Sequence, residues 1–110
     1  MTRESLSEQG FVRVCGYGQV PEIMPYKATI DGRTILVCRT PQGGVSAVDE
    51  MCPHKMQSMA FGVVHEGKII CPHHQYAFDL DTGKTSMRRC PPVEVFQAEL
   101  CDGDVYVKLP

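Results

Sequence analysis

The sequence predicts an all-β domain, and three observations lead to that prediction. Short runs of β-branched or alternating apolar residues recur along the chain, as expected of strands. Turn-forming pairs such as Asp31-Gly32 and Asp102-Gly103 separate these runs. No segment combines a helical period of apolar residues with helix caps. We therefore expect a small sandwich or barrel-like body made of short strands.

In the first half of the chain, residues 1–9 are polar and are expected to be frayed or loosely docked. Asp31-Gly32 predicts a tight hairpin, and Pro41-Gln42-Gly43-Gly44 predicts a second turn. Glycine and proline between residues 16 and 21 predict a loop after the first strand. The strands expected here are Phe11–Cys15, Tyr26–Ile30, Thr34–Cys38 and Val45–Val48.

In the second half, Glu66-Gly67 predicts the turn of a hairpin, and Asp81-Thr82-Gly83-Lys84 turns the chain again. Pro91-Pro92 marks the exit from the central region. The strands expected here are Val63–Val64, Lys68–Ile70, Phe78–Leu80, Val93–Leu100 and Val105–Leu109.

Composition is that of one ordinary globular domain. The chain has 110 residues, 43% of them hydrophobic and 22% charged, so a second domain would have too little core. A net charge of −2 gives no basis for binding nucleic acid. No run approaches the roughly 18 apolar residues of a membrane span, and the N-terminus lacks the apolar core of a signal peptide. We expect a cytoplasmic monomer, a single domain over residues 1–110, that binds neither nucleic acid nor membranes.

Two short segments carry the chemistry of the chain: Cys52-Pro53-His54 and Cys71-Pro72-His73-His74. Each brings one thiol and at least one imidazole, and the hairpin between them is long enough to return Cys71 beside Cys52. Two metal sites fit such a donor set. One is a mononuclear tetrahedral zinc; the other is a [2Fe–2S] centre with two cysteines on one iron and two histidines on the other. The spacing alone does not separate them.

The surrounding residues resemble the Rieske ferredoxin family from about Phe11 to Leu109. The resemblance lies in the two ligand segments, in Phe78-Asp79-Leu80-Asp81-Thr82-Gly83 after them, and in the approach strand from Ser46 to Glu50. It implies one [2Fe–2S] cluster, with Cys52 and Cys71 on one iron and His54 and His74 on the other. The family pattern favours His74 over the adjacent His73. The implied fold is an antiparallel β-sandwich body with an inserted cluster-binding subdomain at about residues 46–83.

The resemblance implies a soluble electron-transfer protein without an active site of its own. It is similar to the ferredoxin components of bacterial ring-hydroxylating oxygenase systems, which take electrons from a flavin-dependent ferredoxin reductase and pass them to a terminal oxygenase. One alternative is the Rieske-like small subunit of a nitrite reductase complex. Another is a structural zinc module that mediates protein contacts.

Departures from the family pattern bear on the reduction potential and the loops. Respiratory relatives link the two loops by a disulfide, but the matching positions here are Gln57 and His73. Their hydroxyl-bearing serine and tyrosine match Tyr76 and Phe78. Phe78 has no hydroxyl, and the hydroxyl of Tyr76 is expected either to reach the cluster or to point to solvent, so we expect fewer donors to the cluster sulfurs. We expect a potential at the low end of the Rieske range, about −150 mV. Met56 stands where a glycine is common.

Four cysteines remain outside the predicted ligand set: Cys15, Cys38, Cys90 and Cys101. In a reducing cytosol they are expected to be thiols. Cys15 and Cys38 lie in apolar runs, where cysteine acts as a small hydrophobic residue. We expect these four to fill space and to have no redox role.

Overall fold

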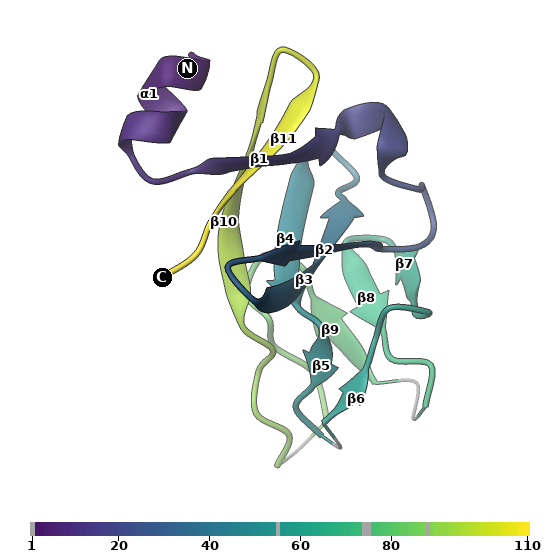
Figure 1. The fold of residues 1–110 in the computed structure, drawn as a ribbon. Helices are drawn as coiled ribbons and strands as arrows, with labels where there is room; N and C mark the ends of the chain where they lie inside the picture. The colour runs from purple at the N-terminus through teal and green to yellow at the C-terminus, as the bar shows by residue number, and fades with distance from the viewer. Residues whose placement is uncertain (1, 55, 74–75, 88) are drawn as a thin grey trace.

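A computed structural model of the chain describes residues 2–54, 56–73, 76–87 and 89–110. Its largest sheet has six strands in the order β1-β11-β10-β4-β3-β2, and every neighbouring pair is antiparallel. In Figure 1, β1 and β2 at the two edges both cross in front of the sheet, so the sheet curves around its own inner face. The strands are β1 (Val12–Gly16), β2 (Tyr26–Ile30), β3 (Arg33–Arg39), β4 (Val45–Asp49), β10 (Val95–Cys101) and β11 (Asp104–Lys108).

This curved sheet encloses one apolar core. Buried side chains from five of its strands meet there, because alternate residues of a strand point to the same face. The all-β expectation and the sandwich-like body are confirmed. The buried residues of this core are Cys15, Val20, Ile35, Val37, Ala47, Phe96, Val105 and Val107.

The hairpin between β2 and β3 forms where the Asp31-Gly32 pair predicts it. Ile30 pairs with Arg33 across the turn, and Asp31 and Gly32 have φ of 50° and 79°. Two successive residues in the left-handed region are typical of the tight turn that matches strand twist. The glycine is what makes the second position easy to occupy.

Two smaller sheets lie at the end of the molecule opposite the N-terminus (Figure 1). One pairs β5 (Met51–Cys52) with β6 (Gln57–Ser58). The other has the order β7-β8-β9 and consists of β7 (Val63–His65), β8 (Lys68–Ile70) and β9 (Ala77–Asp79). They surround a second core, and the buried Ser46 hydroxyl of β4 donates to the Leu80 carbonyl across a distance of 2.6 Å. That bond joins the large sheet to the smaller ones.

The N-terminal residues correct one expectation. Instead of fraying, they form the helix α1 (Arg3–Glu8), in which the Thr2 hydroxyl caps the first turn by accepting from the Ser5 N–H. Leu6 is fully buried against Phe11, Cys101 and Tyr106. A single apolar residue in a polar run gives no visible periodicity, yet it is enough to dock one turn of helix.

Other differences are small. The expected loop after β1 contains the short 3₁₀ helix η1 (Tyr17–Gln19). Strands β5 and β6 were not expected, because two residues are too few to show alternation. Strand β10 begins at Val95, two residues later than predicted, since Val93 belongs to the preceding loop. Within the described residues, no helix has the length and apolar character that a membrane span requires.

Candidate metal centre

The two predicted thiol ligands lie at the ends of short strands. Cys52 closes β5, and Cys71 follows β8 directly. Each loop is held by its own backbone: the Met56 N–H donates to the Cys52 carbonyl over 2.6 Å, and the Cys71 N–H donates to the Tyr76 carbonyl over 2.8 Å. Both cysteines are fully buried in the same core cluster. The hairpin β7–β8 thus places Cys71 in the same core cluster as Cys52.

His54 belongs to the same region and is half-buried. Its Nδ1 atom is buried. Its Nε2 atom lies 3.2 Å from the Tyr76 hydroxyl oxygen, and the two rings stack with centroids 4.2 Å apart at an interplanar angle of 29°. His73 is exposed, and His74 lies outside the described residues.

The donors that the structure describes suit an iron–sulfur centre. Two buried thiols from separate loops and one imidazole with a buried Nδ1 are soft and borderline donors of the kind that bind iron in [2Fe–2S] centres. Taking only the described part of the chain, no three His, Cys, Asp or Glu side chains form a group able to hold a single metal ion.

The acidic residues that flank the loops make contacts within the chain. Asp49 pairs with Arg33 at 3.5 Å, while Glu50 pairs with Lys27 at 3.2 Å and accepts from the Ser58 hydroxyl over 2.8 Å. Glu50 therefore fixes the start of the first loop to β2. These carboxylates position the loops, a role that sequence alone did not assign to them.

Asp79 closes the turn that follows β9. Its carboxylate accepts the backbone N–H groups of Asp81 and Thr82, over 2.8 and 3.1 Å. These two bonds stabilise the ionised form and hold the pKa of the Asp79 carboxyl below its ordinary value. The same turn contains Gly83, at φ 78°, which sequence reasoning noted only as part of a turn signal.

Met56 has a conformation that a methionine seldom adopts. Its φ is 53°, in the left-handed region where a Cβ atom is unfavourable. Its side chain is 64% exposed, so burial offers no compensation. The family's usual glycine at this position was the one signal in the sequence that pointed to this backbone.

The cysteines outside the predicted ligand set behave as packing residues. Cys15 and Cys38 are buried thiols in no disulfide, and Cys90 is a half-buried thiol in no disulfide. Burial raises the pKa of Cys38 to about 12 and raises the pKa of Cys15 as well. Because the thiolate is the reactive form, both are suited to filling space. Cys101 is buried, and its thiol donates to the Asp102 carboxylate at 3.8 Å.

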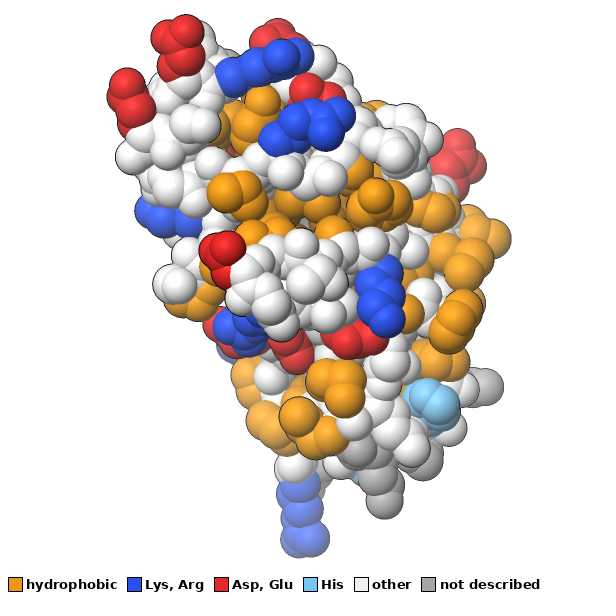
Figure 2. Space-filling view, in the orientation of Figure 1, with side chains coloured by type: hydrophobic (Ala, Val, Ile, Leu, Met, Phe, Trp, Pro, Cys, Tyr) orange, Lys and Arg blue, Asp and Glu red, His pale blue; other side chains and the backbone are white. Residues whose placement is uncertain are grey.

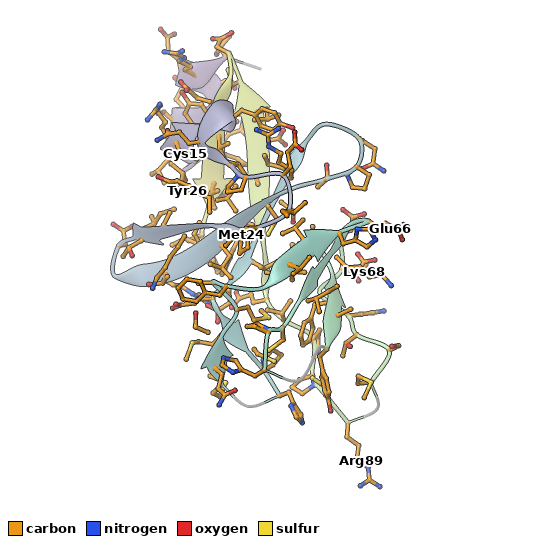
Figure 3. The ribbon with its side chains drawn as sticks, turned by 90° about the vertical axis from the view of Figure 1, so that its right-hand side faces the viewer. Cys15, Met24, Tyr26, Glu66, Lys68 and Arg89 are labelled. Carbon is orange, nitrogen blue, oxygen red and sulfur yellow. The ribbon has the colours of Figure 1, made fainter. Side chains whose placement is uncertain are left out.

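One face beside Cys71 is apolar and exposed. A groove of about 300 Å³ there is lined by Phe61, Gly62, Val63, Ile70, Cys71 and Pro72. Phe61 is 82% exposed, which is unusual for a large aromatic side chain. Figure 2 shows hydrophobic side chains gathered on the side of the molecule that carries β7 in Figure 1. Figure 3 shows Arg89 extending away from the body at the lower end of the molecule.

A larger hollow, of about 390 Å³, lies elsewhere, between the loop after β3 and the β7–β8 turn. Its wall includes Arg39, whose guanidinium donates to the Val20 and Tyr17 carbonyls and lies over the Tyr17 ring. None of the described predicted ligands lines it. It therefore has no part in the metal centre.

Comparison with known proteins bears directly on this centre. A family model for the Rieske [2Fe-2S] domain matches residues 10–97. Ferredoxin CarAc of Metapseudomonas resinovorans is 36% identical over 62 residues, which are 56% of this chain and 58% of that protein. The chain also matches two curated oxygenase subunits, of which the matched part covers only 14% and 17%.

Solved structures share the fold. The ferredoxin of carbazole 1,9a-dioxygenase from Nocardioides aromaticivorans IC177 superposes with a TM-score of 0.80 at 27% identity, covering 91% of this chain and 98% of that one. A nitrite reductase small subunit from Mycobacterium tuberculosis gives 0.79 at 23% identity, covering 88% and 92%, which is a likeness of fold. With four fifths of its length matched by the family model, this chain belongs to the Rieske [2Fe–2S] domain family, and its cofactor is one [2Fe–2S] cluster.

Proposed function

We propose that this chain is an electron carrier whose cluster is held by Cys52 and Cys71 on one iron and by His54 and His74 on the other. The observation that carries the proposal is that two fully buried thiols, from separate loops, lie in one core cluster. Tyr76 packs against that cluster and stacks on His54. When bound, the cluster supplies a one-electron redox couple. The chain's own residues exclude water from the thiols and orient the imidazole.

The proposed acceptor is a terminal oxygenase, and the proposed donor is a flavin-dependent ferredoxin reductase. Support comes from the ferredoxin relatives of this size, one of which serves a carbazole dioxygenase. The apolar groove beside Cys71, with exposed Phe61 on its rim, offers the kind of surface on which a partner protein docks. In this proposal the chain performs no catalysis itself, and it works as a monomer in the cytoplasm.

Two other functions are separated by simple observations. The small subunit of a nitrite reductase has the same fold and would co-purify with a large partner. A structural zinc module would be colourless and contain one zinc per chain.

The test is an absorption and EPR spectrum of the purified protein, before and after dithionite. The proposal expects a red-brown protein with two irons per chain whose reduced form has an EPR signal of low average g value. A colourless, EPR-silent protein that contains zinc would refute it. Replacing His74 by Cys tests the ligand set, since a third thiolate should move the signal toward that of an all-cysteine cluster.

A further inference from the structure

Tyr76 contacts both ligand loops of the proposed centre. Its backbone carbonyl accepts the N–H of Cys71 over 2.8 Å. Its hydroxyl oxygen lies 3.2 Å from Nε2 of His54, and its ring stacks on the imidazole at 4.2 Å. The residue is half-buried and packs against the core that contains Cys52 and Cys71. Tyr76 thus contacts the first loop through its side chain and Cys71 through its backbone carbonyl. The positions that carry a disulfide in the respiratory relatives are Gln57 and His73 here.

The direction of this hydrogen bond follows from the chemistry of a ligated imidazole. Nδ1 of His54 is buried, and Nε2 lies 3.2 Å from the Tyr76 hydroxyl oxygen, so the proposed centre assigns Nδ1 to iron. When Nδ1 binds iron, a neutral imidazole carries its proton on Nε2. Nε2 then donates, and the Tyr76 hydroxyl oxygen accepts. The stacked rings hold the hydroxyl in this position.

Resting on the proposed function, we propose that Tyr76 is a positioning residue that fixes His54 and lowers the reduction potential of the centre. An acceptor on Nε2–H increases the electron density of the imidazole and hence its basicity toward the metal. A more basic ligand stabilises the oxidised state more than the reduced state. The hydroxyl of Tyr76 therefore acts through His54.

This role differs from that of a hydroxyl that donates to cluster sulfur. Such a donor stabilises the reduced, more negative cluster and raises the potential. The acceptor role inferred for Tyr76 lowers the potential, so removing the hydroxyl distinguishes the two by the sign of the change. Phe78, the neighbouring aromatic residue, is fully buried and has no hydroxyl, so it contributes to neither effect.

The experiment measures the midpoint potential of three holoproteins by EPR-monitored redox titration: the parent, Tyr76→Phe and Tyr26→Phe. Tyr76→Phe keeps the stacked ring and removes only the acceptor. Tyr26 packs against the core of the large sheet and lies in the upper half of Figure 3, away from the metal centre, so Tyr26→Phe removes the same atom as a matched control.

We expect Tyr76→Phe to favour reduction by about two- to fivefold, which is a positive shift of about 18 to 41 mV at 59 mV per tenfold for one electron. Tyr26→Phe should leave the potential unchanged. Loss of the cluster from Tyr76→Phe alone would also support the positioning role, because the two variants lose the same atom. An unchanged or lowered potential in Tyr76→Phe overturns the inference. A parent protein without the Rieske EPR signal overturns the proposed function and the inference with it.

Discussion

Gly83 occupies a position that only glycine can fill without moving a neighbouring loop. It lies in the turn after β9 with φ at 78°. A Cβ atom added there would come within 2.0 Å of the Val93 carbonyl oxygen and 3.1 Å of a Val95 methyl group. The same two segments are joined by a 2.9 Å hydrogen bond from the Val93 N–H to the Gly83 carbonyl. Val93 is buried in the core that contains the two proposed ligands, Cys52 and Cys71.

The cost of Gly83→Ala has separable parts. The left-handed conformation costs an alanine about 1 kcal/mol. Moving Val93 out of contact costs about 1–3 kcal/mol, the usual range for overpacking, and the lost hydrogen bond adds about 1 kcal/mol. We therefore expect about 3–5 kcal/mol of destabilisation. Gly32 is a matched control, because its φ is 79° and nothing lies within 4 Å of its added Cβ; Gly32→Ala should cost only about 1 kcal/mol.

Thermal unfolding of the holoprotein measures both variants, followed by far-UV circular dichroism and by bleaching of the visible cluster absorbance. Because cluster loss makes unfolding irreversible, the scans must share one heating rate. At about 4 °C per kcal/mol for a domain of this size, Gly32→Ala should lower the midpoint by about 4 °C and Gly83→Ala by about 12–20 °C. Equal shifts in the two variants would refute the argument, since they would show that the contact with Val93 adds nothing to the destabilisation by Gly83→Ala.

Three further predictions concern the rest of the chain. Leu6→Ala should destabilise the protein by about 2–3 kcal/mol, because the side chain is fully buried; a change below about 0.5 kcal/mol would mean that α1 is not docked. Asp79→Ala should cost about 1 kcal/mol at neutral pH through its lost backbone bonds. The folded pKa lies below the ordinary 3.8, so this contribution is complete above pH 3.8 and is lost as the pH falls through the folded pKa. A penalty in far-UV melts that does not become smaller as the pH is lowered below 3.8 would contradict the assignment. Iodoacetamide at pH 8 should label half-buried Cys90 well before Cys38, whose pKa is about 12; peptide mapping that finds equal rates in the folded holoprotein would show that Cys38 is accessible.

The sequence was enough to predict the strands of the sheet and to locate the candidate ligand segments, because the signals for both lie within a few neighbouring residues. Turn pairs such as Asp31-Gly32 favour the positive φ values that these two residues have in the structure. Strands such as Tyr26–Ile30 show the alternation of more and less buried residues within five positions. The candidate donors are visible because metals bind particular donor types, and the family resemblance then proposes which of them are ligands. These signals need no knowledge of what lies across the molecule.

What the sequence did not predict depends on contacts between distant residues. The burial of Leu6 requires Phe11, Cys101 and Tyr106 to be in place, and nothing within a polar N-terminal run indicates that. The pairing of Glu50 with Lys27 is invisible in a chain where both are ordinary surface residues. Strands of two residues, such as β5 and β6, exist only because the loops around them are held elsewhere.

The contacts that tune the proposed metal centre are also among the features that the sequence did not predict. Phe78 and Tyr76 were predicted from the family pattern to leave the cluster with few hydroxyl donors, and Tyr76 was expected either to reach the cluster or to face solvent. In the structure its hydroxyl lies 3.2 Å from Nε2 of His54, its ring stacks on the imidazole, and its carbonyl accepts from the Cys71 N–H. A candidate ligand can be predicted from the donor types that a metal binds. A residue that tunes a ligand can be identified only from the geometry of the loop that carries it. The low potential expected from missing donors therefore gains a second cause, an acceptor on His54, and the two add in the same direction.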